Sequence, residues 1–561
     1  MKTFRIEAPM MLALVLAACG GGGNASTSGG GHDPSGSGGT GGAGNSSSST
    51  GTGGAPSKCE AFGHFGTPTT TLTLPGGTPG IYYNDIQASF PEVDWQKLDR
   101  LYIPAGKYKY MTLGNLPHRD ASHPLVITNS GGQVQVGPND AGAGYIWSVT
   151  GGSNWILTGR YDPDSKTGDA AFPGHRCGEY ADSRGKYGFL SDDAFAKGQY
   201  LHMGIAVTNA SDFELEFLEI TRSGFAGIRL LNQYKEGDPF LPMNNVRVHD
   251  NYVHDTDGEG FYIGWTGTPP SNKMGKLIIY NNRIIRTGNE ALQIQNLGDG
   301  TEVHHNVVAF AALHWRDNGL GKYQDGNSQV QVREGTVSLH HNVFMGGAGL
   351  LLSFFSSPET GDGARQVTFS NNYFADTLSL GGYFNGTSAE GSSYTLDHNF
   401  FRGLDFGYTV LDPAATDPGV IFSKNTTFTS PITFSNNTWE GSRKITYGLD
   451  GANGTTGNWT ASGNTNGPVT PVAFVQSGYP SGVPTRGLEA WAPKATVSPG
   501  SPDIVYQPGA LVMYDAEMYE CTKQNTALVP KDHPEAWKKL PLPIDDMRVV
   551  SGSPYAEMGV Y

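Results

Sequence analysis

A short phrase recurs in this chain, built around one asparagine that follows an alternating apolar strand. Seven copies align, at "HDNYV", "YNNRI", "HHNVV", "HHNVF", "SNNYF", "DHNFF" and "SNNTW". Their central residues, spaced by 24 to 38 positions, are Asn251, Asn282, Asn306, Asn342, Asn372, Asn399 and Asn437. A recurrence at this period predicts a solenoid in which each copy belongs to one coil, rather than a globular sandwich.

Asparagine suits the fixed corner of such a coil for two reasons. It tolerates the left-handed backbone conformation that a tight corner requires. Its amide also carries both donors and an acceptor, so that identical side chains on successive coils can hydrogen-bond in a ladder. A β-branched apolar residue could do neither. The variable spacing then belongs to loops that leave the coil between fixed corners.

This pattern resembles the right-handed parallel β-helix of pectate-lyase-like proteins, whose inner corner is often an asparagine ladder. The resemblance extends roughly from Leu101 to Trp459. The segment "DFELEFLEITRSGFAGIRLLN" matches a further coil, with Leu218 in the position of the asparagine. The resemblance implies an all-β fold, a right-handed parallel β-helix solenoid with an asparagine ladder. A β-sandwich is the alternative, but it gives no reason for the repeated asparagine.

The first residues predict an exported protein. Lys2 and Arg5 precede an apolar stretch at 10–15, as in a signal peptide. The following "LAAC" resembles the lipobox of bacterial lipoproteins, which implies cleavage before Cys19 and acylation of this residue; an ordinary cleavage site is the alternative. Several acyl chains would anchor the chain firmly. Gly20 stands where inner-membrane lipoproteins of that family carry Asp, so the outer membrane or cell surface is the expected location.

Composition supplies the remaining domain boundaries. We expect a signal peptide at 1–18, a Gly/Ser-rich flexible tether at 19–57, the β-helix at 58–465, a linker at 466–500, a small β module at 501–545 and a C-terminal tail at 546–561. The formal charge of −15 argues against nucleic acid as a partner. We expect a monomer in which Cys59 pairs with Cys177, leaving Cys521.

The segment from Tyr506 to Leu540 resembles the small carbohydrate-binding module of many chitinases. The shared positions are Tyr506, Gly509, Val512, Tyr514, Tyr519, Pro530 and Trp537. The family usually places exposed aromatic residues after the third tyrosine, where this chain has "ECTKQNT". Because an aromatic ring can cover the apolar face of a sugar, we expect Tyr506 and Trp537 to stack on carbohydrate. Tyr514 and Tyr519 are expected in the core of the small sheet.

Stacking the Gly-led strands that come next in the repeat, and their equivalents, gives two columns of a polar patch that face outward. The first predicted column is Arg229, Tyr262, Gln293, Gln331 and Leu351, and the second is Leu231, Gly264, Gln295, Arg333 and Ser353. Glu259 and Glu290 come before equivalent strands, so on adjacent coils they would lie about 5 Å apart. A register slip of one residue would exchange the two faces of each strand.

Three kinds of site fit this patch. Glu259 and Glu290 suit the paired carboxylates of a retaining glycosidase. Asp255, Asp257 and Glu259 could instead hold Ca²⁺, which prefers oxygen ligands. Solvated surface acids are the third alternative. The loop at 314–327 adds further candidates that, with Arg333, could supply the base and the positive charge of a β-elimination, namely Lys322 and Tyr323.

The remaining predicted substrate-binding residues are aromatic or amide side chains of the same region, namely Trp265, Tyr262, Tyr323, Gln293, Gln295 and Gln331. The pairs His304–His305 and His340–His341 could suggest a metal site. Alternation, however, would point one histidine of each pair inward and the other outward, which favours structural roles.

The sequence therefore favours a surface-anchored, carbohydrate-active protein that binds and cleaves an extracellular polysaccharide, as a lyase or a glycoside hydrolase. Ca²⁺ is the expected cofactor, and the membrane is reached through Cys19. A non-catalytic adhesin or wall-binding spacer is the main alternative, because no complete catalytic motif of the fold is present. A helper in metal-cofactor assembly is a third, but it gives no reason for the terminal module.

Overall fold

The structure is a computed structural model that divides into two compact units, residues 1–58 and 59–561. It describes residues 67–560, all in the second unit, except for 139–144, 160–184, 194–201, 232–242, 265–272, 318–325, 350, 357–361, 379–380, 387–388, 405–420, 424–429, 441–445, 449–458, 476–486, 496–502 and 543–544. The predicted lipidation site Cys19, the tether and the Cys59–Cys177 pair lie outside the described residues. In the described part, no helix is long and apolar enough to cross a bilayer.

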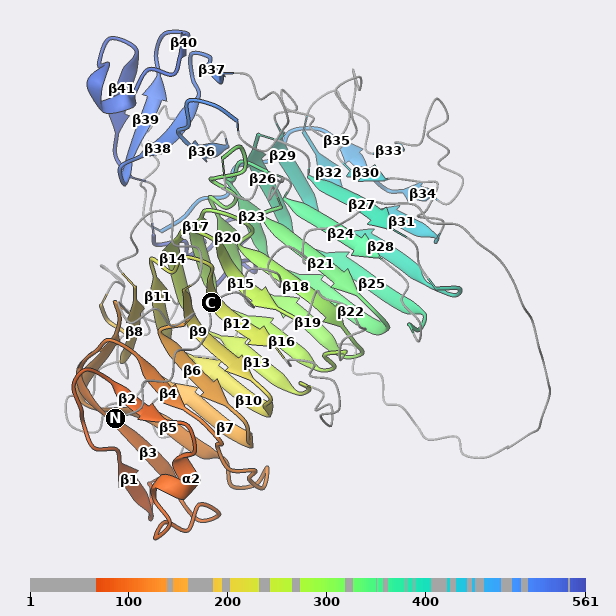
Figure 1. Cartoon of the computed structure of the whole chain (residues 1–561). Helices are drawn as coiled ribbons and strands as arrows, with labels where there is room; N and C mark the ends of the chain where they lie inside the picture. The colour runs from red at the N-terminus through yellow and green to blue at the C-terminus, as the bar shows by residue number, and fades with distance from the viewer. Residues whose placement is uncertain are drawn as a thin grey trace, which may run out of the picture. The chain divides into compact units, whose positions relative to one another are not determined.

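Most of the second unit is a coil whose strands stack into three parallel faces (Figure 1). The first face comprises β1 (Thr71–Thr73), β3 (Arg100–Tyr108), β5 (Leu125–Val136), β7 (Ser153–Thr158), β10 (Ser211–Glu216), β13 (Val246–His249), β16 (Leu277–Tyr280), β19 (Thr301–His304), β22 (Gly335–His340), β25 (Arg365–Ser370), β28 (Ser393–Asp397), β31 (Ile432–Ser435) and β34 (Trp459–Ser462). The second comprises β8 (Phe189–Asp192), β11 (Leu218–Thr221), β14 (Tyr252–Thr256), β17 (Arg283–Thr287), β20 (Val307–Ala309), β23 (Val343–Met345), β26 (Tyr373–Thr377), β29 (Phe400–Leu404), β32 (Thr438–Trp439) and β35 (Thr465–Asn466).

The third face is a separate sheet of twelve strands. They are β2 (Ile81–Tyr83), β4 (Met111–Leu113), β6 (Trp147–Thr150), β9 (Met203–Thr208), β12 (Ala226–Leu231), β15 (Glu259–Ile263), β18 (Leu292–Leu297), β21 (Ser328–Val332), β24 (Leu352–Ser356), β27 (Gly382–Gly386), β30 (Ile421–Ser423) and β33 (Thr446–Gly448). A short helix, α2 (Ile86–Ser89), lies before β3. Each strand pairs in parallel with the strand one coil later, as β13 does with β16 and β14 with β17. The predicted parallel β-helix is therefore confirmed.

The asparagine ladder runs along the corner between the first and second faces. Each of the seven asparagines donates its side-chain amide to the next side-chain carbonyl at 2.9–3.2 Å, and the last donates to Asn464, which extends the ladder by one rung. Leu218 occupies the predicted equivalent position, because its backbone N–H donates to Asn251 at 3.0 Å. The ladder therefore satisfies buried backbone as well as side-chain groups.

One part of the corner prediction was wrong. The left-handed residue is the one before each ladder asparagine, with φ of 57° at Asp250, 57° at Asn281 and 54° at His305. The ladder residue itself is needed for its two-sided amide, whereas its neighbour makes the bend. Asp, Asn and His in that neighbouring position are short polar residues that visit this conformation more readily than others.

The interior of the coil is filled by the inward side chains of all three faces. Similar residues stack from coil to coil, such as Phe344 on Phe374 at 5.2 Å and Phe374 on Phe401 at 5.0 Å between ring centroids. Trp155 and Phe213 stack in an earlier coil at 4.6 Å. Because each ring stacks on the ring of the paired strand in the next coil, burial of these rings fixes the register between neighbouring coils.

The C-terminal residues form a small β module, as predicted. Its four-stranded sheet contains β36 (Leu488–Ala490), β38 (Leu511–Tyr514), β39 (Glu517–Cys521) and β41 (Trp537–Leu540), and a second pair joins β37 (Val505–Tyr506) to β40 (Asn525–Thr526). A 3₁₀ turn, η3, covers Pro530–Asp532. Strand β36 lies inside the segment predicted as a linker. Cys521 is a free, buried cysteine.

The end of the chain packs on the second face of the β-helix. Outward side chains of this face, including Ile285, Val307 and Met345, share one apolar cluster with residues of the C-terminal 95 positions. Those residues include Val469, Leu488, Leu511, Met547, Val549, Tyr555, Met558 and Val560. Met547, Val549, Tyr555, Met558 and Val560, in the segment expected as a tail at 546–561, are thus buried against the β-helix.

Candidate functional site

A cavity of about 990 Å³ lies where the second face meets the C-terminal segment, and we call it the flank cleft. Its lining residues are Gly185, Leu190, Asp192, Glu219, Thr221, Arg222, His254, Asp255, Thr256, Asp257, Arg286, Leu313, His314, Asp317, Ala490, Trp491, Ala492, Met513, Tyr514, Asp515, Ala516, Lys531 and Leu542. The polar groups come mainly from strands β8, β11, β14 and β17 and the turns that follow them. Two aromatic residues come from the C-terminal part.

The cleft exists because the outward residues of the second face change character along the stack. Register places Asp192 beside Thr221, and Thr221 beside His254. On later coils the same column continues as Ile285, Ala309 and Met345. The apolar part of this column is covered by the C-terminal segment, whereas its polar beginning lines the cleft.

Ion pairs hold the rim of the cleft at the left-handed ends of these strands. Arg222 makes a bidentate pair with Asp192 at 2.7 and 2.5 Å. Arg286 likewise contacts Asp255 at 2.5 and 3.1 Å, and reaches Asp545 at 2.6 Å. Burial alone would raise the pKa of Asp255, but Arg286 and a neighbouring imidazole outweigh it and hold that pKa well below its usual range. Asp255 is therefore ionised, and the carboxylates of Asp192 and Asp255 are held in place by their arginines.

A histidine links two carboxylates at the floor of the cleft. The ring of His254 lies with Nδ1 2.7 Å from Asp255 and Nε2 3.3 Å from Glu219. The second oxygen of Glu219 accepts from the backbone N–H of Gly185 at 2.6 Å. Tyr252, two residues earlier on the same strand, stacks on the imidazole at 4.2 Å. His254 and Glu219 are both buried, so this series of hydrogen bonds orients the Asp255 carboxylate rather than contacting solvent directly.

A second carboxylate–imidazole pair is more open. His314 Nδ1 lies 3.4 Å from Asp257 Oδ1, and their side chains are 24% and 18% exposed. Asp257 follows β14, and its backbone N–H donates to Ser223. The turn after β20 carries His314 and ends at the exposed Asp317, whose N–H donates back to the His314 carbonyl at 3.0 Å. Asp257, His314 and Asp317 are thus among the acid–base groups of the cleft that a ligand can reach.

The opposite wall is aromatic. Trp491 and Tyr514 meet edge to face, with centroids 5.2 Å apart and planes at 87°. Lys531 places its ammonium 5.4 Å from the centre of the Tyr514 ring and 3.2 Å from Asp515. Both rings are only partly buried. An apolar wall opposite carboxylates suits a ligand with one apolar and one hydroxyl-bearing surface, which is the character of a sugar ring.

The predicted residues divide between this cleft and other places. Asp255 and Asp257 line the cleft. Glu259 and Glu290 do fall at equivalent positions of adjacent coils, but both are buried, at 4% and 2% exposure, and neither lines the cleft. Glu259 has the same parity along β15 as the core residue Phe261, so its side chain is not on the outward face. Burial raises the pKa of Glu259 to about 8.

The predicted outward columns were partly wrong in register. Arg229, Tyr262 and Gln293 do align, but the next coil contributes Gln329 instead of Gln331, and Ser353 instead of Leu351. The two-residue shift preserves the facing of each strand. Tyr262 and Gln293 are buried at 8% and 5% exposure, while Gln295 and Gln331 are half-buried on this third face. Leu231, predicted to face outward, is also buried.

Other candidates have structural surroundings or fall outside the description. Arg333 is buried, pairs with Asp362 and donates to Asn296 at 3.2 Å. Tyr506 and Trp537, predicted as exposed sugar platforms, are instead buried at 2% exposure each and pack edge to face in the core of the small module. Lys322, Tyr323 and Trp265 lie outside the described residues.

The calcium prediction stays a prediction. Asp255 already pairs with Arg286, and Glu259 points away from the cleft, so the three proposed ligands have different surroundings. Among the described residues, the group of acidic and histidine side chains close enough to share an ion is Glu214, Glu216 and His249, on the first face.

The histidine pairs also differ from expectation. All four rings are half-buried and lie in two stacks, His304 on His340 and His305 on His341, each at 5.0 Å. Alternation fails because His305 and His341 adopt the left-handed corner conformation, with φ of 54° and 55°. Within each pair the Nδ1 atoms lie 2.9 Å apart.

The cleft residues that the sequence prediction missed include Glu219, His254 and Trp491. A usable signal was present for the first two. In the strand after each corner asparagine, outward positions are polar on the early coils and apolar on the later ones. That change marks where a covering segment ends. Trp491 carried no such signal, because its position depends on packing between distant parts of the chain.

Comparisons with known proteins give distant structural matches only. No family model matches the chain, and no curated protein does. Among solved structures, a GH136 lacto-N-biosidase from Eubacterium ramulus is 10% identical with a TM-score of 0.41, over 66% of this chain and 62% of that one. Pectate lyase Pel9A is 10% identical with a TM-score of 0.39, over 76% and 87% of the two chains. A GH87 α-1,3-glucanase from Streptomyces thermodiastaticus is 12% identical with a TM-score of 0.34, over 71% and 69%.

This chain thus spans less than two thirds of the lacto-N-biosidase. At TM-scores below 0.5 these likenesses carry no argument about activity, and the parallel β-helix described above follows from the strand pairing of this chain alone.

Proposed function

We propose that this protein binds a neutral glycan in the flank cleft and hydrolyses it. The observation that carries the proposal is the combination of an aromatic wall, Trp491 and Tyr514, with six carboxylates among the lining residues. Carboxylate pairs are the usual acid–base groups of glycoside hydrolysis. Partly exposed aromatic rings can position a sugar without desolvating its hydroxyl groups.

Within the cleft, the proposed acid–base residues are Asp257 and Asp317. Asp257 is partly exposed and is oriented by His314 at 3.4 Å, and Asp317 lies in the same turn as that histidine. Asp192 and Asp255 are less suitable, because each carboxylate is fixed in an ion pair with an arginine. The buried floor residues Glu219 and His254 would orient the carboxylate of Asp255 rather than contact the glycan.

The charge of the cleft favours a neutral glycan over a uronic acid polymer. Its three Arg and Lys residues already pair with acids: Arg222 with Asp192, Arg286 with Asp255, and Lys531 with Asp515. β-Elimination requires a cation to offset the substrate carboxylate. Carboxylates outnumber these cations two to one in the lining, so an anionic polymer would meet net repulsion. Hydrolysis therefore fits the site better than elimination.

The test is incubation of the purified protein with a panel of neutral and uronic polysaccharides. We expect new reducing ends from a neutral glycan, without the ultraviolet absorbance of unsaturated products. Asp257→Asn and Asp317→Asn should each lower kcat by at least about 100-fold. Asp120→Asn is the matched control, because that exposed aspartate lies outside the cleft lining.

Two results would contradict the proposal. Unsaturated products from a uronic polymer would assign a lyase. Retention of a polysaccharide without any new chain ends would favour the non-catalytic adhesin instead. Export, a lipid anchor at Cys19 and a monomeric state belong to the same proposal, and metabolic labelling of the expressed protein with a fatty acid would test the anchor.

A further inference from the structure

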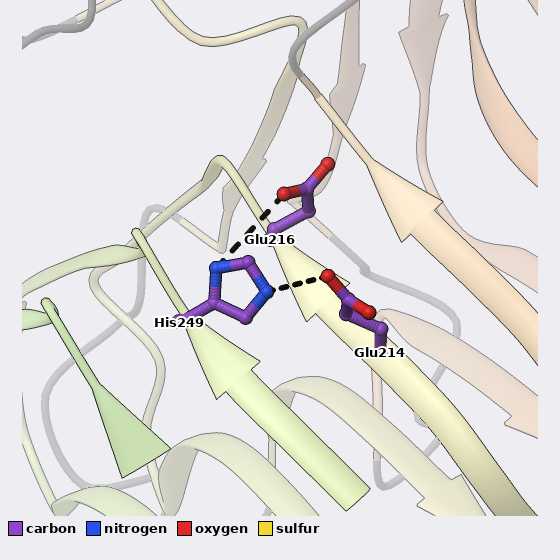
Figure 2. Close-up of side chains that lie close together, drawn as sticks. All are labelled: Glu214, Glu216 and His249. Carbon is purple, nitrogen blue, oxygen red and sulfur yellow. Dashed lines mark hydrogen bonds and ion pairs between the residues drawn. The ribbon is translucent and has the colours of Figure 1, made fainter. Parts of the chain in front are cut away.

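Away from the flank cleft, the first face carries a compact group of one histidine and three carboxylates. Strands β10 and β13 pair with Glu216 beside His249, and Glu214 lies two residues earlier on the same outward face. Figure 2 shows the imidazole of His249 between the carboxylates of Glu214 and Glu216. Asp250, at the left-handed corner after β13, contacts the same ring. None of the four residues lines the flank cleft.

The ring of His249 is held in one orientation. Its Nδ1 lies 2.5 Å from Asp250 Oδ2, and its Nε2 lies 2.6 Å from Glu214 Oε1. Tyr280, from the next coil, stacks on the ring at 4.3 Å with planes 12° apart. In metal sites a histidine commonly donates one ring N–H to a carboxylate and binds the ion through the other nitrogen, which here faces Glu214.

Glu216 supplies a second, independent indication of a cation. Its side chain is buried, at 3% residue exposure, and its Oε1 has no hydrogen-bond partner among the described residues. Its Oε2 lies 3.9 Å from His249 Nδ1. A buried carboxylate oxygen without a partner is costly, and its usual explanation is a water or an ion.

We propose that Glu214, Glu216 and His249 bind one divalent transition-metal ion, with Zn²⁺ as the best fit. One ligand atom from each residue lies within 4.8 Å of the other two, so small side-chain movements bring all three onto one ion. The ion takes the place of the proton on Nε2, and Asp250 keeps the proton on Nδ1. A nitrogen ligand beside two carboxylates suits Zn²⁺ better than Ca²⁺ or Mg²⁺, which prefer oxygen alone.

The site also has an access route. The Glu214 side chain is 21% exposed, whereas those of His249 and Glu216 are 4% exposed. The ion would therefore keep a water on the side of Glu214 and would connect two adjacent coils of the first face. Because the ligands come from neighbouring strands, binding would stabilise the folded protein over the unfolded chain.

The experiment is calorimetric titration of the EDTA-treated protein with ZnCl₂. We expect one saturable site, a rise in melting temperature with Zn²⁺, and little binding of Ca²⁺. Glu216→Gln and His249→Ala should each weaken Zn²⁺ binding by about 100-fold, and Asp250→Asn by about 10-fold. His398→Ala is the matched control, since His398 pairs with Asp397 at 2.7 Å on a later coil and should leave binding unchanged.

Glu214→Gln changes the most exposed ligand and keeps the test informative if a core variant does not fold. Anomalous scattering at the zinc edge from a soaked crystal should place the ion between β10 and β13. Three results would overturn the proposal: no saturable Zn²⁺ site in the wild-type protein, equal affinity in His249→Ala, or an ion located elsewhere. None of these depends on glycan cleavage.

Discussion

Replacement of one asparagine in the middle of the ladder should show how much the ladder stabilises the fold. Asn342 is fully buried, and its amide donates to Asn372, to the Val303 carbonyl and to the His340 carbonyl at 2.9–3.0 Å. Its Oδ1 accepts from both the backbone N–H and the side-chain amide of Asn306 at 3.0 Å. Asn342→Ala removes these five hydrogen bonds together.

The expected loss follows from which partners remain unsatisfied. The Asn306 backbone N–H loses its acceptor, and a buried group left in this way costs about 1–3 kcal/mol. The Asn306 amide keeps two other acceptors, and Asn372 Oδ1 keeps the Asn342 backbone N–H, so these groups lose less. Together with a small cavity, Asn342→Ala should lower the free energy of unfolding by about 3–5 kcal/mol.

Asn464 provides the matched comparison at the end of the ladder. It accepts from Asn437 through the same two bonds, at 2.9 and 3.2 Å, but it is half-buried, so water can replace it. Asn464→Ala should therefore cost less than about 1 kcal/mol. Urea denaturation followed by circular dichroism measures both values. Equal losses in the two variants, or a loss below 1 kcal/mol for Asn342→Ala, would refute the reasoning.

Three further outcomes are expected. Burial, with the neighbouring imidazoles, lowers the pKa of His304 to about 3 and that of His340 to about 4. The two neutral histidines therefore contribute stability above the unfolded pKa of about 6.5, and this stability is lost as pH falls toward the folded pKa values. In the double variant His304→Gln, His340→Gln, the melting temperature should depend less on pH between about 4 and 6.5 than in the wild-type protein. Arg286→Met should cost about 2–3 kcal/mol in urea, below the usual loss for a buried pair, because Asp255 keeps 32% side-chain exposure; an unchanged midpoint would contradict the role of this pair. Trp491→Ala should raise KM for the glycan about tenfold with little change in kcat, and an unchanged KM would remove this ring from the binding site.

The sequence predicted the fold well because the information is local and repeated. Each corner carries its asparagine, so seven rungs could be identified without knowing what surrounds them. The backbone conformation of the corner was assigned one residue too late, since Asn, Asp and His at the preceding position share the same tolerance. The two-residue shift at β21 followed from the long segment between β20 and β21, whose length gives no register.

The site was harder to predict because it depends on contacts between distant segments. Asp255 and Asp257 were identified as acids near a corner, but alternation along β15 turns Glu259 toward the core side. The opposite wall, Trp491, lies far along the chain, and no periodic signal connects it with β14. The resemblance to a sugar-binding module pointed to Tyr506 and Trp537, which are buried, rather than to Tyr514, which faces the cleft.

The C-terminal residues cover coils that lie about 250 to 275 positions earlier in the sequence, with Val560 and Met558 joining the cluster that contains Ile285 and Val307. A chain truncated before this segment would expose the apolar residues along one side of the stacked coils. The C-terminal segment is thus needed to cover the apolar side of these coils. Truncated products should aggregate or be degraded, even though every hydrogen bond of their asparagine ladder can still form.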